Sequence, residues 1–509
     1  MVVRYTAVLL ALLCLLFFSI HIQPWMPDDA FISFRYAENL TEGHGLVYNA
    51  GERVEGYTSF LWVILLAAGN RFGIDLVVFS KIMGIVFALG CIAVLFSAHR
   101  FIREIDYSIS TAALFMMGSS GIFLPWGISG TEVTLFAFLI LLSVLCYIKI
   151  KDSGDYRKFI ILGLLCSLAM LTRPEGLLLS GTLVVYHSIA KRDFRSAAYL
   201  SAVIIFIYGP YFCWRYIYYG YPLPNTFYAK VGFNTSQVIR GIKYLMYNVT
   251  SFLLVLFPLM DPGAAYRWLK RYRGFVILPL VCGVYTIYII LIGGDSMPAF
   301  RFFVYIMPVI CLLSAMFIAL FGRRTMAFFI VAVLAFNITM WNFVYFIPHI
   351  KKSRVAEFGR EVGTWLAANV PGDAVIATNT AGSIPYYSGL KTIDMLGLND
   401  PHIAHRRIPE IGTGWPGHEK SDGDYVLSRE PDLIQFGSSL GRKTPVFCGD
   451  YELFNNPEFR KKYVLKSIEM PSGNILHIYQ RRDRPVLPEG GERGISVRLD
   501  RLAPTASMG

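Results

Sequence analysis

The sequence predicts a polytopic α-helical membrane protein with about eleven transmembrane helices and a C-terminal α/β domain. The composition is 55% hydrophobic and only 16% charged over 509 residues, with a mean hydropathy of +0.49. Apolar runs of membrane-spanning length follow one another through residues 1–350, and a soluble-type composition begins near residue 351. A chain this apolar is not a single soluble globule.

The predicted spans are the apolar runs long enough to cross the hydrocarbon core of a bilayer. The run at 4–22 resembles a signal peptide, but no small-residue cleavage site follows it, so we interpret it as a retained first span. The run at 58–69 is too short to span and predicts a juxtamembrane or re-entrant helix. The spans lie near residues 4–22, 75–99, 107–126, 131–149, 158–172, 175–190, 196–216, 244–260, 274–293, 302–322 and 325–347.

Positive charge fixes the predicted orientation. Lys and Arg are enriched in cytoplasmic loops, and here they cluster in every second loop. With Arg4 at the start, this pattern puts the N-terminus in the cytoplasm and the C-terminal domain in the periplasm of a bacterial inner membrane. The same placement explains the net charge of +12 without nucleic acid as a partner. The clusters lie at 99–103, 149–158, 191–195, 267–273 and 323–324.

Cysteine usage points to neither disulfides nor a Cys-based zinc site. Seven of the 8 cysteines lie in apolar segments, and Cys448 stands alone in the polar part. Without neighbouring thiols in the polar part, no disulfide framework or thiolate metal site can form there.

The outer loops differ from the positive ones. They carry carboxylates, cations, Asn, Gly and Pro at 28–29, 130–132, 172–176, 219–230 and 293–301. Ionisable groups at helix ends are costly to desolvate unless they pair or face a wet cavity, so these loops predict one shared polar cavity. For any single loop, interfacial snorkelling and turn formation are the alternative.

The adjacent carboxylates Asp28 and Asp29 are the first chemical candidates, because they follow the first span and precede helical sequence at 30–40. Such a pair can supply a general base and a group that orients it or binds a metal. The alternative is that one of them only caps the helix, since Asp is a preferred N-cap residue.

Residues 351–484 predict an α/β domain. An amphipathic helix is expected at 353–369 and strands at 374–378 and 392–395, whereas the Arg-, Gly- and Pro-rich tail 485–509 is expected to be disordered. Three histidines stand near carboxylates in this domain and could contact a substrate or a metal. Their irregular spacing also fits ordinary surface residues. They are His402, His405 and His418, near Asp394, Asp400 and Glu419.

The whole pattern resembles the GT-C superfamily of membrane glycosyltransferases, in which an outer loop with an acidic pair follows the first helix. Residues 27–36, 51–58 and 223–230 look more closely like the terminal β-(1→2)-arabinofuranosyltransferase family of mycobacterial cell-wall assembly and its Gram-negative relatives. The resemblance covers the membrane part, residues 1–350, and extends more loosely to 382–398 and to Gly417-His418. Unlike in that family, no long C-terminal carbohydrate-binding extension is expected here.

The resemblance implies an inverting glycosyltransferase that moves a sugar from a polyprenyl-phosphate donor in the bilayer to a cell-envelope glycan or glycolipid. Asp28 is the first choice for the base and Asp29 the second. No cofactor is defined by the sequence, and a divalent metal stays open. The donor phosphate needs cations, and the sugars need hydrogen-bonding and stacking groups. The cation candidates are Arg35, Arg173, Lys230 and Arg301, and the sugar-binding candidates are His44, Tyr57, Glu132, Glu175, Asn225 and Asp295.

Because these cations sit near a wet interface, we expect that removing Arg173 or Lys230 weakens donor use without unfolding the protein. The alternatives from other classes are a lipid or polysaccharide transporter, for which no internal repeat is evident, and a non-catalytic envelope-assembly subunit. A protein O-glycosyltransferase would differ only in its acceptor.

Overall fold

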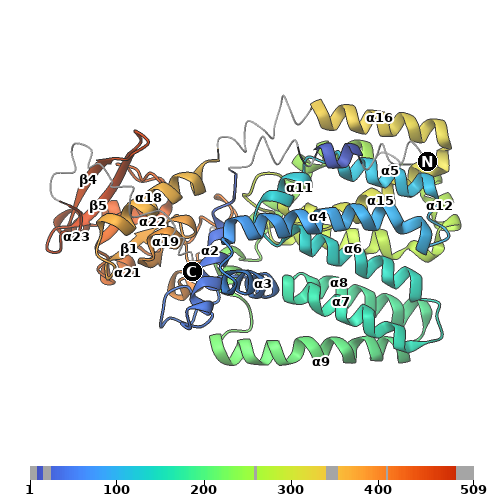
Figure 1. Cartoon of the computed structure of the whole chain (residues 1–509), viewed down its shortest axis with the longest axis horizontal. Helices are drawn as coiled ribbons and strands as arrows, with labels where there is room; N and C mark the ends of the chain where they lie inside the picture. Colours follow the sequence, from blue (N-terminus) through green and yellow to red (C-terminus); the bar gives the residue numbers. More distant parts are fainter. Residues whose placement is uncertain are drawn as a thin grey trace, which may run out of the picture.

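The computed structural model describes residues 9–14, 16, 25–256, 261–339, 353–408 and 411–488. The helices of residues 25–339, called the helical part, form one elongated body, and residues 353–488, called the C-terminal part, pack against one end of it (Figure 1). Residues 9–14 are helical. The rest of the predicted first span, the last residues of the predicted span 325–347 and most of the tail 485–509 lie outside the described residues.

The helices of the helical part coincide with the predicted apolar runs at 75–99, 131–149, 158–172 and 196–216 and overlap the others that are described. They are α2 (Asp29–Thr41), α3 (Phe60–Arg71), α4 (Leu76–Phe101), α5 (Tyr107–Gly118), η1 (Leu124–Ile128), α6 (Val133–Ile150), η2 (Tyr156–Lys158), α7 (Phe159–Thr172), α8 (Gly176–Tyr186), η3 (His187–Lys191), α9 (Phe194–Tyr219), α10 (Asn225–Lys230), α11 (Thr235–Leu256), α12 (Pro262–Arg271), η5 (Arg273–Phe275), α13 (Ile277–Leu291), α14 (Arg301–Val304), α15 (Met307–Ile318), η6 (Ala319–Phe321) and α16 (Arg323–Thr339).

Among the described residues, four helical stretches are long and apolar enough to cross a membrane: α4, α6, α9 and residues Arg273–Leu291. The 26 residues of α4 rise about 39 Å at 1.5 Å per residue, more than the hydrocarbon core requires. On α9, Phe206 is 82% exposed and Ile217 is 81% exposed, as expected for side chains that face lipid. The total of about eleven spans stays a prediction.

The C-terminal part is a five-stranded sheet with helices around it. Strands β1, β2 and β3 are parallel, and β5 and β4 extend the sheet in antiparallel fashion in the order β2-β1-β3-β5-β4. The predicted helix and both predicted strands are confirmed to within two residues. The elements are α18 (Val355–Asn369), β1 (Val375–Thr378), α19 (Ser383–Ser388), β2 (Lys391–Asp394), α20 (Pro401–His405), α21 (Gly423–Ser428), β3 (Leu433–Gln435), α22 (Cys448–Asn455), α23 (Pro457–Lys462), β4 (Tyr463–Glu469) and β5 (Ile475–Arg481).

Helix α18 shows why this part folds as predicted. Its buried residues Val362, Trp365 and Leu366 follow the spacing of one helical face. They join a core with Ile376 of β1 and Leu433 of β3, so the apolar stripe covers one side of the sheet.

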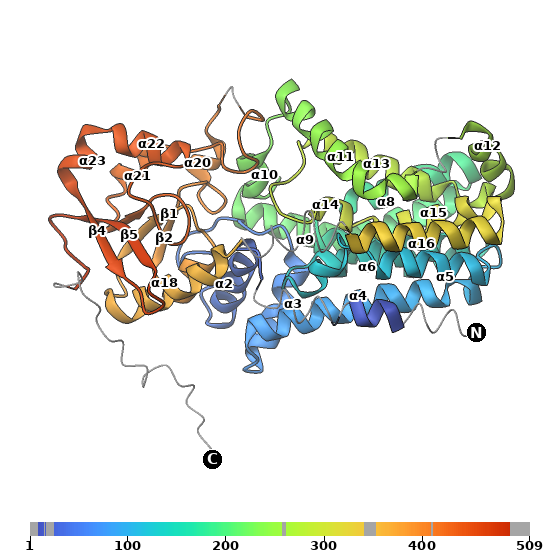
Figure 2. The same ribbon diagram turned by 90° about the horizontal axis from the view of Figure 1, so that it is seen from above.

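Helices α2, α3, α10 and α14 lie at the end of the bundle that faces the C-terminal part, whereas α12 lies at the opposite end (Figure 2). Helix α12 carries Arg267, Lys270 and Arg271 of the positive cluster 267–273 that the sequence assigns to the cytoplasm. The outer loops and the C-terminal part therefore share one end of the molecule, as the alternation of positive loops predicts.

We expect an alkaline phosphatase fused after residue 484 to be active in a bacterial host, because the positive clusters and the predicted odd number of spans predict a periplasmic location for that end. The matched control is a fusion in the positive loop 149–158, which should be inactive. An active cytoplasmic reporter after residue 484 would mean that the short helix α3 spans the membrane and that the orientation is wrong.

Candidate functional site

The first outer loop fastens the C-terminal part to the helical part. The guanidinium group of Arg35 is buried and donates to three backbone carbonyl groups: those of Tyr48, of Pro385 and, at 2.8 Å, of Leu390. A planar guanidinium with several donors suits such a junction. Arg35 is therefore engaged in an interdomain contact and does not reach either of the cavities described below.

Two further residues of the same loop extend this contact. The Asn49 side chain donates to the carbonyl of Thr392 at 2.9 Å and accepts from its N–H at 3.1 Å, as a neighbouring strand would. The Tyr48 hydroxyl donates to the carbonyl of Ala381 at 2.6 Å. Together with Asp28, the residues Arg35, Tyr48 and Asn49 form what we call the interdomain clamp.

Asp28 holds the start of a helix in the other part of the molecule. Its carboxylate accepts from the N–H groups of Gly382 and Ser383, each at 2.8 Å, and from the Ser383 hydroxyl. It makes no cap for its own helix α2. A Cβ on Gly382 would lie 1.9 Å from the Asp28 carbonyl oxygen, so this approach requires glycine. Capping is thus the role that the structure gives Asp28, but for α19 instead of α2.

Asp29 lies where two cavities meet. The first, which we call the polar cavity, has a volume of about 170 Å³ and is enclosed mainly by the helical part. The second, the interdomain cavity, has a volume of about 590 Å³ and lies between the two parts. Asp29, Lys230 and Gly417 line both. Groups at this junction can contact molecules bound in either cavity.

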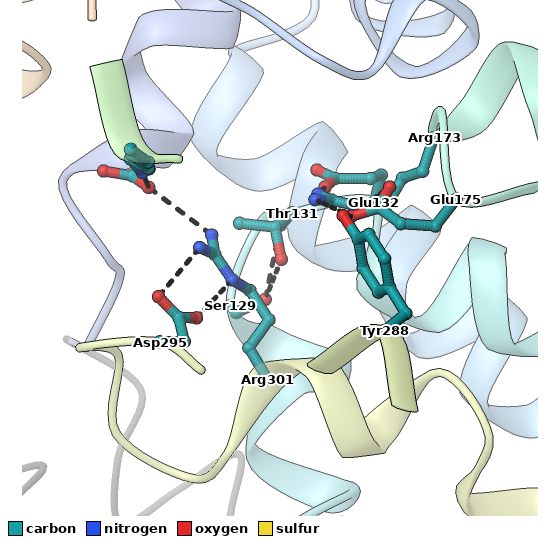
Figure 3. Close-up of polar contacts among 10 residues, drawn as sticks. Ser129, Thr131, Glu132, Arg173, Glu175, Tyr288, Asp295 and Arg301 are labelled. Carbon is teal, nitrogen blue, oxygen red and sulfur yellow. Dashed lines mark hydrogen bonds and ion pairs between the residues drawn. The ribbon is translucent and has the colours of Figure 1, made fainter. Parts of the chain in front are cut away.

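In the polar cavity, Arg301 lies between two carboxylates (Figure 3). Its Nε is 2.7 Å from Asp295 Oδ2, and its Nη1 is 3.4 Å from Asp29 Oδ2. Asp295 and Arg301 have side chains that are 7% and 9% exposed, whereas Asp29 is 26% exposed. Asp295 therefore holds the Arg301 side chain in place, and Nη1 of the guanidinium group faces Asp29.

A second ion cluster closes the polar cavity farther from the C-terminal part. Arg173 pairs with Glu132 and, at 3.0 Å, with Glu175, and Tyr288 donates to Glu175 at 3.3 Å (Figure 3). All three charged residues are less than 10% exposed. The sequence placed Arg173 at a wet interface on which the fold does not depend. In the structure, Arg173 instead neutralises two buried carboxylates. The expectation that the fold does not depend on Arg173 is therefore wrong.

Lys230, the last residue of α10, is the more exposed of the two cations at Asp29. Its Nζ is 4.0 Å from Asp29 Oδ2, and its side chain is 34% exposed. Burial raises the pKa of Asp29, but the opposing charges of Lys230 and Arg301 outweigh it and hold the pKa below its ordinary value. Asp29 is therefore ionised at neutral pH.

Asp28 has the opposite balance. Burial raises the pKa of Asp28 above its ordinary value, although the hydrogen bonds from Ser383 and Gly382 act against the rise. The two adjacent carboxylates thus differ in surroundings. Asp28 accepts hydrogen bonds from the start of α19 in the C-terminal part, whereas Asp29 faces two cations.

Most of the predicted site residues come together. Those that line the polar cavity are Asp29, Tyr57, Glu132, Arg173, Glu175, Lys230, Asp295 and Arg301. Asp28 lines the interdomain cavity. Arg35, His44 and Asn225 line neither. His44 is half-exposed beside Glu42, and the Asn225 side chain donates to the carbonyl groups of Gly397 and Leu398. The shared polar cavity that five loops predicted is therefore present.

The three histidines of the C-terminal part have different surroundings. His402 pairs with Asp422 at 2.9 Å, and the ring of His405 lies 4.3 Å from that of Tyr228. Only His418 lines the interdomain cavity. Within the described ranges, no group of three or more His, Cys, Asp or Glu residues is arranged to hold a metal ion.

Sequence reasoning missed the cavity residues of the C-terminal part, above all Asn379, Trp415 and Phe447. Trp415 gave one signal, because it is an aromatic residue within a Gly- and Pro-rich loop at 412–417. Asn379 follows β1 at the carboxyl end of a parallel strand, where α/β folds commonly place binding groups.

Two solved structures share this architecture with the chain. ArnT from Cupriavidus metallidurans bound to undecaprenyl phosphate matches with a TM-score of 0.51 and 14% identity, over 76% of this chain and 85% of that one. The oligosaccharyltransferase AglB from Archaeoglobus fulgidus, in complex with an inhibitory peptide and a dolichol-phosphate, matches with a TM-score of 0.53 and 13% identity, over 93% and 74%. The chain therefore has the GT-C fold that the sequence predicted.

Sequence comparison identifies more specific relatives. A terminal β-(1→2)-arabinofuranosyltransferase of Mycobacterium tuberculosis is 26% identical over 219 residues, which cover 40% of this chain and 35% of the relative. One of Corynebacterium glutamicum is 25% identical over 374 residues, which cover 64% and 52%. These matches span a third to a half of the relatives' length. The predicted resemblance to this group is confirmed. Residues 348–480 match a domain of unknown function, DUF8728.

Proposed function

We propose that this chain is an inverting glycosyltransferase that moves a sugar from a polyprenyl-phosphate donor to a glycan or glycolipid acceptor at the periplasmic face of the inner membrane. One observation carries the proposal. An ionised carboxylate, Asp29, stands at the junction of two cavities with Lys230 and Arg301 beside it. The fold and the relatives support this class of reaction.

In this proposal the polar cavity receives the donor. The phosphate of a lipid-linked sugar binds cations strongly, and Lys230 and Arg301 are the two cations that contact Asp29 at the cavity junction. Arg173 lies deeper and keeps Glu132 and Glu175 in place as acceptors for sugar hydroxyl groups. The polyprenyl chain extends from there between the apolar helices into the bilayer.

Asp29 is the proposed base, in place of Asp28. Its carboxylate takes the proton of an acceptor hydroxyl group as that oxygen attacks the anomeric carbon of the donor sugar. A new C–O bond forms on one face of that carbon while its bond to the phosphate oxygen breaks on the other. Polyprenyl phosphate leaves with the bonding pair, its charge balanced by Lys230 and Arg301. Asp28 cannot take this part easily, because three hydrogen bonds already occupy its carboxylate.

A membrane assay with radiolabelled polyprenyl-phosphate sugars tests the function and the sugar together. Membranes containing the chain should transfer label from one donor sugar to an envelope glycan, and membranes with Arg301→Met should not. No transfer from any polyprenyl-phosphate sugar, with the protein folded and inserted, would contradict the proposal. Movement of intact labelled lipid across the bilayer would instead identify a transporter.

The pH dependence of transfer should change when Lys230 is replaced by Met. Lys230 lowers the pKa of Asp29, so its removal raises that pKa, and the ionised base is lost at a higher pH. The acid limb of kcat/KM should therefore shift upward in pH relative to the wild type. Lys461→Met, an exposed lysine of α23 with 71% side-chain exposure, is the matched control and should leave the limb in place. An unshifted limb in Lys230→Met would remove Asp29 as the titrating base.

A further inference from the structure

Loop 411–419 of the C-terminal part contributes to the walls of both cavities and is docked on the start of α11. The Asn234 side chain donates to the carbonyl of Ile411. A Cβ on Gly412 would lie 2.5 Å from the backbone nitrogen of Gln237, so the two chains pack without room for a side chain between them. The loop is therefore held by the helical part.

A largely buried ion pair secures this contact. Arg240 Nη1 is 2.8 Å from Glu419 Oε2, and the two side chains are 15% and 6% exposed. The other carboxylate oxygen, Oε1, accepts from the N–H groups of Gly412 and Gly414 at 2.6 and 2.8 Å. Arg240 Nη1 also donates to the Gly414 carbonyl at 3.2 Å. Glu419 thus shapes the loop, and Arg240 attaches it to α11.

The loop in turn contacts Lys230. A Cβ on Gly417 would lie 3.1 Å from Lys230 Cε, so the lysine side chain rests directly on the loop backbone, where a φ of +77° favours glycine. The Lys230 carbonyl accepts from Nε2 of the fully buried Gln237 at 2.9 Å. The main chain of Lys230 is therefore held by α11, and its side chain lies between the loop and Asp29.

Arg240 also contacts the segment that fixes the second cation at Asp29. Its Nε donates to the Gly293 carbonyl at 3.1 Å. Two residues after Gly293, Asp295 holds the Arg301 side chain toward Asp29 (Figure 3). One guanidinium group is thus bonded to both segments that place a cation beside Asp29.

Arg240 lines the polar cavity, but Glu419 already neutralises its charge. A buried ion pair of this kind can simply fasten two parts of a protein together. Its bonds to the segments that hold Lys230 and Arg301 indicate a more specific role, because the Coulomb energy of each cation with Asp29 depends on the distance between them.

Building on the proposed function, in which Asp29 is the base, we propose that the Arg240–Glu419 ion pair positions Lys230 and Arg301 at Asp29. Docking of the C-terminal part is thereby coupled to the charge balance of the site. Arg240 and Glu419 act through the two cations and are positioning residues. The titratable and charged groups that face Asp29 are Asp28, Lys230, Arg301 and His418.

Glu419→Gln separates positioning from a direct charge effect. The amide keeps an oxygen for the two loop N–H groups but loses the charge that holds Arg240. Loss of a negative charge would by itself lower the pKa of Asp29, whereas displacement of the two cations raises it. We expect the acid limb of kcat/KM to move to higher pH by about 0.5–1 unit, a fraction of the effect of an adjacent cation.

Two further variants test the same limb. Arg240→Lys conserves the charge but lacks the fork of donors, so displacement of the cations is its main effect, and the limb should again move to higher pH. In the double variant of Glu419→Gln with Lys230→Met, the shift should be smaller than the sum of the two single shifts, because part of the effect of Glu419 passes through Lys230.

A second readout does not require sugar transfer. The full-length chain in detergent is treated with an amine-reactive ester, and mass spectrometry measures the labelling rate of Lys230 relative to that of Lys461, whose side chain is 71% exposed. The Lys230 side chain is 34% exposed in the wild type. Glu419→Gln should raise its relative labelling rate several-fold, because the lysine loses its support on Gly417.

The matched control is Glu52→Gln, the same chemical change in an interdomain ion pair that lines neither cavity. Glu52 lies 2.8 Å from Lys391 and 3.4 Å from Arg429. This variant should alter neither the limb nor the labelling of Lys230.

The proposal is overturned by a limb that stays in place or moves to lower pH in Glu419→Gln, by an equal shift in Glu52→Gln, or by unchanged labelling of Lys230. If the labelling changes as expected and the wild type transfers no sugar from any donor, the positioning role stands and the proposed function fails.

Discussion

Replacement of Asp29 by Asn is expected to reduce sugar transfer by about 10²–10⁴-fold, the usual contribution of a general base. The change removes the charge that accepts the proton and keeps the size of the side chain. It also removes the negative charge that faces Lys230 and Arg301, both within 4.0 Å of Asp29 Oδ2. The measurement is initial transfer rate with labelled polyprenyl-phosphate sugar in protein shown to be inserted and folded.

Asp28→Asn is the matched comparison, because it makes the same chemical change one residue earlier. An Asn side chain keeps only one acceptor oxygen for the three donors of Gly382 and Ser383. We therefore expect it to lose about 1–3 kcal/mol of stability and to keep transfer within about 10-fold of the wild type. Near-normal transfer by Asp29→Asn, together with an inactive but stable Asp28→Asn, would make Asp28 the base, which was the first choice from the sequence.

The second large effect concerns stability. Arg173→Met leaves Glu132 and Glu175 buried without a cation, and breaking a buried ion pair in this way typically costs about 3–5 kcal/mol. We expect a markedly lower thermal midpoint for the detergent-solubilised protein, measured by tryptophan fluorescence. Lys230→Met is the matched control, because its 34% exposed side chain should leave the midpoint nearly unchanged.

A rescue variant separates charge from packing. In Arg173→Met combined with Glu132→Gln and Glu175→Gln, no buried charge is left unpaired, so much of the lost stability should return. Sugar transfer should stay impaired, because the hydrogen-bonding pattern around the cavity is altered. An unchanged midpoint in Arg173→Met alone would show that water reaches these carboxylates.

Hydropathy and the positions of Lys and Arg predicted the division into a helical part and a C-terminal part. Both signals can be read from short stretches of sequence, because they depend on the length of each apolar run and on the charge of each loop. The gathering of Glu132, Arg173 and Asp295 was also predictable, since loops on one side of a membrane converge. The separation of Asp28 from Asp29 was not. Neighbouring residues at a helix start point about 100° apart, and which of them meets Gly382 depends on where a segment more than 350 residues later packs.

Arg35 illustrates a second limit. In the sequence it is a cation beside an acidic pair, which is typical of phosphate binding. In the structure its partners are backbone carbonyl groups, which carry no signature in the sequence. The place of Asn379 beside the interdomain cavity was hidden for the same reason, because it depends on a hydrogen bond to Asp450, 71 residues later in the chain.

The interdomain clamp has a consequence for exchanging C-terminal parts between this chain and its relatives. Arg35 and Tyr48 contact the C-terminal part through main-chain carbonyl groups, and Asn49 through the main chain of Thr392, so these contacts tolerate almost any side chain there. Only Asp28 requires particular residues, the Gly382-Ser383 pair. A chimaera that keeps a glycine and a serine at these two positions should therefore keep the contacts of the clamp. Because Asp28 and Asp29 share a peptide bond, such a graft would also keep Asp29, the proposed base, in register with the new C-terminal part.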